Sequence, residues 1–434
     1  MLDLRTLRQD PAPVREALAR RSVAYAERLD ALLEADEAYR AVLAAVERMR
    51  SERNSLSQSV PVARREGREE EAQAAIARVR EMAAEMARLE QSETELFERV
   101  RERLLEVPNV PHPSVPPGGE NDAVEVRRYD APPLGAPAST PEAHWDIGQR
   151  LGLLDFERAS KVSGSRFVFY RGLGARLERA LINFMFDHHA SRGYTEMLPP
   201  YLVKEETLYG TRHLPKFRED MFVTEDERFL ISTSEIPLTA YHGGEILSAE
   251  ELPIRYTAYS ACFRSEAGAA GRDTRGLIRQ HQFDKVEMVT LCRPDESYEV
   301  LERMTADAES VLKALNLSYR VVTLAVGDLG FSSAKTYDLE VLLPGSGGGY
   351  REISSVSNVE AFQARSLGIR YRDEAGKVHH VHTLNGSGVA VGRALAAVLE
   401  QGLQADGSVA LPAALWPYMG GVREIPADAR VAAP

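Results

Sequence analysis

Residues 27–105 form the stretch that most limits what this chain can fold into. Ala, Glu, Arg and Leu dominate it, whereas Pro and Gly nearly vanish. Apolar residues recur in it at alternating steps of three and four, which is the heptad pattern of a coiled coil. The first run, with Asp36 as an imperfect member, is Leu29, Leu32, Asp36, Tyr39, Leu43 and Val46. The second run is Val79, Met82, Met86, Leu89, Leu96 and Val100.

One break, near Val60-Pro61 and Gly67, separates the two heptad runs. A single break between two long runs predicts an antiparallel helical hairpin. Helices of about 35 residues, at a rise of about 1.5 Å per residue, would give an arm about 50 Å long.

Arginines gather near the predicted tip of this hairpin. They are Arg48, Arg50, Arg53, Arg64, Arg65 and Arg68. Glu47, Glu52 and Glu66 lie among them and weaken the signal of a basic surface. A dimerising or purely structural coiled coil with a solvated charged face explains these residues as well as nucleic-acid binding does. The arm alone leaves both interpretations open.

The composition limits the class of protein. A chain of 434 residues with 44% apolar and 27% charged residues is long enough for two globular domains. No apolar run approaches the roughly 20 residues of a membrane span, and we expect no signal peptide. Two cysteines, Cys262 and Cys292, exclude a disulfide framework and a cysteine-built zinc site, which favours the cytoplasm. The net charge of −12 argues against non-specific nucleic-acid binding but allows a local basic face.

Prolines end the helical region. Five of them between residues 108 and 117, followed by Gly118-Gly119, predict a linker, and a second Pro-rich stretch runs over residues 132–141. We therefore expect an N-terminal helical domain over residues 1–110, a linker over 111–140 and a second domain over 141–420. Residues 421–434 are expected to form a poorly ordered tail.

The second domain reads as mixed α and β structure. Apolar and β-branched runs predict strands over residues 256–263, 282–291, 319–324, 337–343 and 378–383. Helical patterns cover residues 176–192, 297–315 and 389–401. Because strands and helices do not alternate regularly, an α+β domain with an antiparallel sheet flanked by helices is favoured over a doubly wound sheet.

Charged residues of both signs follow two of the predicted strands. Phe263-Arg264-Ser265-Glu266 ends the first strand, and Arg279, Phe283 and Glu287 lie on its return. This hairpin would bring Arg264, Glu266, Arg279 and Glu287 together. Burying such a set is costly unless it binds a charged ligand. A surface hairpin with salt bridges explains any one pair, but the whole set favours a ligand site.

These residues resemble the class II aminoacyl-tRNA synthetases. Phe263-Arg264-Ser265-Glu266 is similar to the second motif of that class, and Gly386 to Arg393 is similar to the third. Gly193 to Pro200 looks like the first motif, which forms a dimer interface. The glycines near Gly386 alone would indicate only a tight turn, and no βαβ unit follows them to suggest a dinucleotide site. Three motifs in the right order carry the resemblance.

Within the class, the chain resembles the seryl-tRNA synthetases of bacterial type. Thr233-Ser234-Glu235 is similar to their serine-binding loop, and Arg351 to Asn358 to their strand for ATP and magnesium. An N-terminal antiparallel coiled coil is the arrangement of that family. Departures are limited to packing positions, with Val356 and Val359 where many relatives carry cysteine and Leu342 where many carry tryptophan.

The resemblance implies activation of L-serine by ATP to seryl-adenylate and transfer to the 3′ end of tRNA(Ser). It assigns the α-phosphate to Arg264, the γ-phosphate to Arg393, and Mg²⁺ to Glu352 with Ser355. Phe283 would stack on adenine. The implied ATP-binding set is Arg264, Ser265, Glu266, Arg279, Phe283, Glu352, Ile353, Ser354, Ser355 and Arg393, in which Arg264, Glu352 and Arg393 are catalytic.

Serine recognition is assigned in the same way. The implied serine-binding set is Thr233, Ser234, Glu235, Arg264, Glu287 and Ser387. Glu235 and Thr233 suit the ammonium, and Glu287 suits the hydroxyl, with Ser387 nearby. A pocket that hydrogen-bonds the hydroxyl can reject alanine strongly.

The resemblance also implies partners. It predicts a homodimer, and it predicts that the arm holds tRNA(Ser) through Arg48, Arg53, Arg64, Arg65 and Arg68. The sequence leaves tRNA(Sec) open as a second acceptor. A ligase that loads a carrier protein would lack the hairpin. A non-catalytic paralogue acting as a scaffold would have lost Arg264, Glu352 or Arg393. Another class II specificity is disfavoured by the Thr233-Ser234-Glu235 loop and by the absence of an anticodon-binding C-terminal domain from the pattern.

Overall fold

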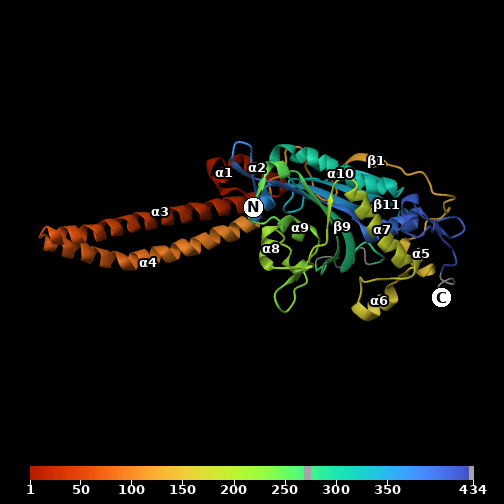
Figure 1. The fold of residues 1–434 in the computed structure, drawn as a ribbon, viewed down its shortest axis with the longest axis horizontal. Helices are drawn as coiled ribbons and strands as arrows, with labels where there is room; N and C mark the ends of the chain where they lie inside the picture. Colours follow the sequence, from red (N-terminus) through yellow and green to blue (C-terminus); the bar gives the residue numbers. More distant parts are fainter. Residues whose placement is uncertain (268–274, 430–434) are drawn as a thin grey trace. The chain divides into compact units, whose positions relative to one another are not determined.

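The computed structural model describes residues 1–267 and 275–429 (Figure 1). It divides the chain into an N-terminal unit, Leu2–Pro108, and a C-terminal unit, Asn109–Pro434 together with Met1. The division lies next to the limit expected at residue 110. Residues 430–434 of the expected tail lie outside the described residues.

The N-terminal unit contains the predicted hairpin. Short helices α1 (Leu4–Gln9) and α2 (Ala12–Arg21) precede two long ones, α3 (Val23–Arg65) and α4 (Glu69–Glu106). Helices α3 and α4 run side by side and pack against each other, which confirms the helical hairpin (Figure 1). We call this pair of helices the arm. The helices have 43 and 38 residues, more than the pattern predicted.

Pro61 does not end the first long helix, as its place in the sequence suggested. It lies inside α3, and the chain turns at Gly67, which has a φ of +73°. Glycine adopts such a backbone without steric cost, whereas a proline near the end of a helix removes only one hydrogen bond. The turn is therefore made by the glycine.

The heptad positions form the narrow core of the arm. Leu29, Leu32 and Val46 of α3 are buried, as are Met82 and Val100 of α4. This pattern of burial agrees with the a and d positions of a coiled coil.

Asp36, the imperfect heptad member, is also buried, but it is paired. Its carboxylate accepts hydrogen bonds from Arg8 at 2.6 and 2.9 Å and from Arg40 at 3.0 Å. Burial alone would raise the pKa of Asp36, yet the two arginines hold this pKa below its usual range. The irregular position is thus a satisfied ion-paired site between α1 and α3.

The C-terminal unit is built on an eight-stranded sheet in the order β1-β10-β11-β12-β15-β9-β8-β4. All neighbours pair antiparallel except β4 and β8, which confirms the predicted sheet type. The strands are β1 (Val124–Tyr129), β4 (Thr195–Met197), β8 (Ile254–Phe263), β9 (Gln282–Cys292), β10 (Tyr319–Thr323), β11 (Lys335–Leu343), β12 (Gly349–Glu360) and β15 (His382–Ala390).

Three helices cover this sheet. They are α7 (Leu173–Ala190), α10 (Ser297–Ala314) and α12 (Val391–Gln401), all close to the ranges read from the sequence. They share one large apolar core with the central strands, because every turn of α12 presents buried residues such as Leu395 and Val398. Smaller helices, α5 (His144–Arg150), α8 (Glu205–Gly210), α9 (Glu235–Ala240) and α11 (Phe362–Leu367), surround the core.

Three segments differ from expectation. The supposed linker contains β1, an edge strand whose side chains are mostly exposed and therefore lack an apolar signal. The run at 378–383 is two strands, β14 (Val378–His380) and β15, which belong to different sheets. The tail expected from residue 421 contains β17 (Glu424–Ile425), which pairs with β16 (Val409–Ala410) and buries Ile425. Within the described ranges, no helix is both long enough and apolar enough to cross a membrane.

Candidate active site

A cavity of about 570 Å³ in the C-terminal unit brings together most of the residues that the sequence singled out. Its walls come from β9, β12 and β15, from the start of α12, from residues 264–266 just after β8, and from segments near residues 213–221, 232–235 and 277–280. The predicted residues that line it are Thr233, Glu235, Arg264, Glu266, Arg279, Phe283, Glu287, Glu352, Ile353, Ser355, Ser387 and Arg393.

Three predicted residues do not line this cavity. Ser234 is fully buried beside it, and Ser354 donates its hydroxyl hydrogen bond to the carbonyl of Ser387 at 2.5 Å. Ser265 donates from its backbone amide to the carbonyl of Asp220 at 2.9 Å. Neighbours in an extended chain point to opposite sides, so one residue of each motif faces away from the ligand space.

Other lining residues received no individual role in the sequence analysis, although Ala390 and Gly392 lie within the third motif. They include His213, Phe217, Asp220, Met221, Ser232, Leu277, Ile278, Gln280, Lys285, Asn385, Ala390 and Gly392. Lys285 could have been found, because it stands two residues before Glu287 on β9 and therefore shares its face. Apart from Arg279, the residues at 213–221 and 277–280 carry no comparable signal, since only the fold brings them to the site.

Arg264 supplies a positive charge at the end of β8. Its guanidinium lies 5.0 Å from the centre of the Phe283 ring, and its backbone amide donates to the carbonyl of His281 at 2.9 Å. Among the described residues the guanidinium forms no ion pair with a carboxylate. The neighbouring Arg279, by contrast, is paired with Glu266 at 2.8 Å. Arg264 is thus held against Phe283, and no carboxylate of residues 1–267 or 275–429 neutralises its charge, which suits an anionic ligand.

Arg393 lies in the first turn of α12 and is held by two different segments. Its Nε and Nη2 donate to the carbonyl of Ile278 at 3.3 and 3.2 Å. Its Nη1 donates to the carbonyl of Glu352 and lies 3.6 Å from the Glu352 carboxylate. The guanidinium therefore connects β12 to the segment 277–280 at the edge of the cavity.

Two further carboxylates, Glu235 and the buried Glu287, also line the cavity. Glu235 accepts hydrogen bonds from Gln363 at 2.7 Å and from Asn385 at 2.9 Å. Lys285 Nζ lies 2.6 Å from the Glu287 carboxylate and donates to Thr233 Oγ1 at 2.8 Å. This part of the site offers one buried carboxylate without a cationic partner at hydrogen-bond distance and one carboxylate with a partner.

Burial decides the protonation of these groups. It raises the pKa of Glu235 and that of Glu287, and the positive charge of Lys285 offsets only part of this rise. Burial, with the charges of Arg264 and Lys285, lowers the pKa of His213 to about 4, so its imidazole is neutral at neutral pH. A ligand ammonium would stabilise the ionised carboxylates and restore their usual pKa range.

Oxygen atoms suited to a metal ion lie on β11 and β12. Glu352 and Ser355 both line the cavity, and Asp338 stands opposite Ser355 in the ladder between these strands. Asp338 Oδ1 is buried without a hydrogen-bond partner among the described residues, and burial together with Glu352 raises the pKa of Asp338 well above its usual value. No group of three or more His, Cys, Asp or Glu side chains in the described ranges could hold a metal alone. The donors fit a hard cation that keeps water or phosphate ligands, such as Mg²⁺.

Two family models match the chain. Residues 1–111 match the seryl-tRNA synthetase N-terminal domain, and residues 219–402 match the tRNA synthetase class II core domain (G, H, P, S and T). The serine--tRNA ligase of Caldicellulosiruptor saccharolyticus is 54% identical over 97% of this chain and 99% of its own length. That of Pelotomaculum thermopropionicum is 53% identical over 98% of this chain and 100% of its own.

Solved structures agree with these relatives. The seryl-tRNA synthetase of Pyrococcus horikoshii complexed with ATP is 37% identical, with a TM-score of 0.91 over 98% of this chain and 99% of that one. The cytoplasmic serine-tRNA ligase of Naegleria fowleri in complex with AMP is 30% identical, with a TM-score of 0.83 over 96% and 95% of the two chains. The protein is a ligase that activates serine with ATP and transfers it to tRNA, and the chain belongs to the seryl-tRNA synthetase family.

Proposed function

We propose that ATP and L-serine bind side by side in the 570 Å³ cavity, with ATP along Arg264, Arg393 and Glu352 and with serine against Glu235 and Glu287. The observation that carries this assignment is that one cavity contains both the guanidinium groups of Arg264 and Arg393 and the carboxylates of Glu235 and Glu287. Guanidinium groups suit a polyphosphate, and enclosed carboxylates suit an ammonium.

Arg264 acts on the α-phosphate. Serine activation is an in-line attack of the serine carboxylate on this phosphorus, with pyrophosphate leaving. Since both reactants are anions, the site must supply positive charge and accurate placement rather than proton transfer. The Arg264 guanidinium is free of carboxylate partners within the described residues and is fixed against Phe283. Phe283 in turn offers a ring face to the adenine.

Arg393 binds the γ-phosphate, and Glu352 with Ser355 holds Mg²⁺. When bound, the ion supplies charge neutralisation for the phosphates. Two carbonyl groups orient the Arg393 guanidinium before any ligand arrives. The side chain therefore loses little conformational entropy when the ligand binds. Glu352 faces the cavity with about half of its side chain exposed.

Glu235 and Thr233 receive the serine ammonium, and Glu287 accepts the hydrogen bond of the serine hydroxyl, close to Ser387. Lys285 holds both side chains in position, with its Nζ 2.6 Å from the Glu287 carboxylate and 2.8 Å from Thr233 Oγ1. Alanine leaves the Glu287 oxygen unpaired in a buried site, which lowers its reactivity strongly.

The arm holds the tRNA through its arginines, and the acceptors are tRNA(Ser) and also tRNA(Sec). Arg48, Arg53 and Arg65 form no ion pair within the described residues, which suits phosphate contacts. Charging assays with transcripts of tRNA(Ser), of tRNA(Sec) and of one tRNA specific for another amino acid test this assignment. Equal charging of all three transcripts would contradict it.

The assembly is a homodimer of the cytoplasm. The segment from Gly193 to Pro200 includes the edge strand β4, and Leu198 within it has 83% of its surface exposed in the single chain. A large exposed apolar residue beside a sheet edge fits a two-fold interface. Light scattering should give twice the mass of one chain, and a stable monomer would exclude this state. Cell fractionation tests the compartment.

Serine-dependent exchange between ATP and pyrophosphate tests the whole assignment. All twenty amino acids are assayed, and serine should be the only good substrate. Faster exchange with proline or threonine would show that the pocket has been assigned to the wrong amino acid.

A further inference from the structure

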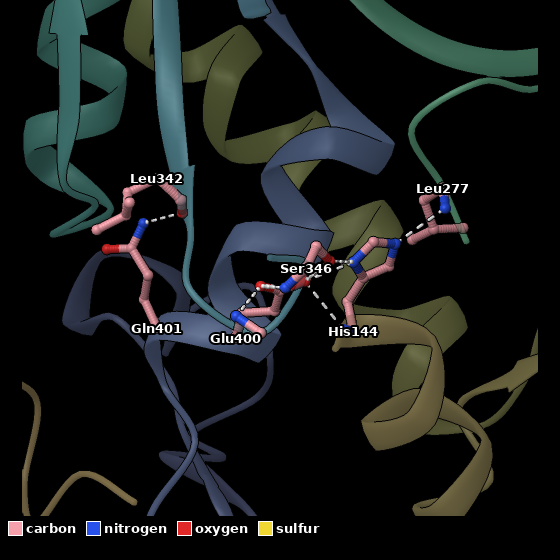
Figure 2. A network of polar contacts seen from close by, with 7 residues as sticks. His144, Leu277, Leu342, Ser346, Glu400 and Gln401 are labelled. Atoms are coloured by element: carbon pink, nitrogen blue, oxygen red, sulfur yellow. Dashed lines mark hydrogen bonds and ion pairs between the residues drawn. The ribbon is translucent and has the colours of Figure 1, made fainter. Parts of the chain in front are cut away.

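A buried histidine outside the motifs forms the centre of a polar network (Figure 2). His144 begins α5, Glu400 lies on α12, and neither side chain is exposed to solvent. His144 Nδ1 lies 2.7 Å from Glu400 Oε1, which also accepts the backbone amide of His144 at 3.0 Å. Because an ionised carboxylate only accepts hydrogen bonds, Nδ1 carries the imidazole proton and Nε2 is left as an acceptor.

The free nitrogen holds the backbone at the cavity wall. The amide of Leu277 donates to His144 Nε2 at 3.0 Å. Gly276 approaches the ring so closely that an added Cβ would lie 2.2 Å from Nε2. Leu277, Ile278, Arg279 and Gln280 all line the cavity. The histidine therefore sets the position of a segment that reaches the ligand space.

The same segment determines where Arg393 lies. Ile278, the residue after Leu277, offers its carbonyl to Nε and Nη2 of Arg393. Arg393 and Glu400 are seven residues apart on α12, which places them two turns apart on one face of the helix. The contacts thus form a closed ring that runs from Glu400 through His144 and the 277–278 backbone to Arg393 and back along α12.

A second branch joins this ring to β12. The other oxygen of Glu400 accepts the backbone amides of Gly345 at 2.7 Å and Ser346 at 3.1 Å, in the turn between β11 and β12. Figure 2 shows Ser346 beside both Glu400 and His144. Strand β12 carries Glu352, so one buried carboxylate orients both segments that hold the Arg393 guanidinium.

We propose that His144 is a positioning residue for ATP, whose unprotonated Nε2 holds the 277–280 segment where the Ile278 carbonyl orients Arg393. His144 itself is not among the residues that line the cavity. Its effect rests on the role proposed above for Arg393, and it is local to the phosphate end of the cavity. Serine binding depends on Glu235, Glu287 and Lys285. Within the described residues, the side-chain partners of these three are Gln363, Asn385, Thr233 and one another, not the residues that join Glu400 to Arg393.

Two substitutions separate the nitrogen atoms of the ring. In His144→Gln the side-chain amide reaches the place of Nε2 and can accept from Leu277. In His144→Asn it reaches only the place of Nδ1 and can donate to Glu400. Loss of one hydrogen bond is worth about 1 kcal/mol, or roughly fivefold. We expect the KM for ATP in the exchange assay to rise by about fivefold in His144→Asn and much less in His144→Gln, with the KM for serine within about twofold in both.

A purely structural histidine predicts another result. The thermal midpoint would fall, while the KM for ATP and the KM for serine stayed unchanged or moved by the same factor; either outcome overturns the proposal. If His144→Asn does not fold, Gly276→Ala displaces the same backbone without altering the histidine. It should raise the KM for ATP selectively, and an unchanged value rules out the inference.

Arg393→Ala distinguishes failure of this inference from failure of the proposed ATP site. If Arg393→Ala leaves ATP binding unchanged, the assignment of Arg393 is wrong, and the positioning role falls with it. If Arg393→Ala weakens ATP binding but His144→Asn does not, only the positioning role is wrong. When both residues are replaced, the losses should be less than additive, because the two act through one contact.

Discussion

Charged groups are arranged differently in the arm and in the cavity. The buried carboxylate of the arm, Asp36, has two arginine partners, and its pKa is lowered. The buried carboxylates of the cavity, Glu235 and Glu287, have raised pKa values because their partners do not offset burial. The buried charge of the arm is neutralised by other residues of the chain, whereas the cavity carries charges that a bound ligand would neutralise.

The exposed arginines of the arm can also be divided into those that pair within the chain and those that do not. Arg50 pairs with Glu90 at 2.9 Å and Arg78 with Glu52 at 3.2 Å, across the two helices. Such exposed pairs each contribute about 0–1 kcal/mol, so they align the helices more than they stabilise them. Arginines left outside these pairs are the ones available to RNA. The comparison therefore predicts where substitutions affect stability and where they affect ligands.

Removing most of the arm should produce the largest effect. Residues 41 and 95 lie across from each other, because Tyr39 and Phe97 are in ring contact at 5.7 Å. Deletion of residues 42–94, closed by a short glycine-rich turn, keeps that contact and removes the five arginines assigned to RNA. We expect serine-dependent exchange to persist and tRNA charging to fall by about 10³-fold or more through lost phosphate contacts. Near-normal charging by the shortened protein would exclude the arm from tRNA binding.

Arg264→Ala tests the cationic side of the cavity. Loss of one preorganised charge-stabilising donor lowers the rate by about 10²- to 10³-fold, and the exchange rate should fall by that factor. Arg228→Ala is the matched control, since Arg228 lies in an exposed turn paired with Asp226 at 3.4 Å. A well-folded Arg264→Ala protein with normal exchange would remove Arg264 from the reaction.

Glu287→Gln tests the acidic side. The amide is isosteric, so Lys285 keeps its bond to Thr233, whereas the charged acceptor for the serine hydroxyl is lost. Hydrogen bonds to charged groups are worth about 1.5–3 kcal/mol, so we expect the KM for serine to rise by about 10- to 100-fold. Discrimination against alanine should narrow while the KM for ATP stays constant. Glu340→Gln on β11, whose partner is Arg320, is the control.

Asp36→Asn tests the buried carboxylate of the arm and its ion pairs with Arg8 and Arg40. Because the folded pKa of Asp36 is lowered, its contribution to stability is present above the unfolded pKa of about 3.9 and is lost as pH falls through the folded value. We expect the variant to be less stable by about 1–3 kcal/mol at pH 7. Thermal unfolding followed by circular dichroism should show the difference narrowing below about pH 4. A difference that does not change with pH would mean that packing, not charge, sets the effect.

Single arginines of the arm should give the smallest effects. Arg65 has no ion pair within the described residues, whereas Arg68 lies against Glu66 and Glu71. Arg65→Ala should weaken tRNA charging a few-fold and reduce its salt dependence by about one phosphate contact. Arg68→Ala should do less, because its charge is already neutralised. The opposite order would show that the internal pairs break when RNA binds.

Long, continuous patterns explain what the sequence could predict of the fold. The heptads predicted the arm, and the apolar runs of β8 and β9 predicted the central hairpin with Arg264 at its end. Strand β1 could not be found, because an edge strand with exposed side chains lacks an apolar pattern. Ile425 is buried only because β16 lies beside it, which no local pattern records.

The site residues also fall into a group that the sequence could predict and a group that it could not. Arg264 and Arg393 belong to motifs with a characteristic order, Glu287 lies on the strand that follows the second motif, and the structure places all three in one cavity. Ile278 and Leu277 contribute backbone groups, whose role does not depend on side-chain type and so leaves no trace in the sequence. His144 lies more than a hundred residues from Leu277 in the chain, and only the fold brings its ring to that amide. The contacts that orient the charged residues are thus the part that the sequence hides.

The return of the chain to the sheet as β1 limits how this protein can be recombined with its relatives. Asn109 donates from its backbone amide to the carbonyl of Phe331 and from its side chain to Ser332 and Val359, each at 2.9 Å. Residues 109–140 therefore belong to the catalytic half, although their prolines and glycines look like a tether. A chimaera that exchanges arms should be joined between Pro108 and Asn109. A junction placed near residue 140 would transplant a foreign edge strand into the sheet and weaken the recipient enzyme.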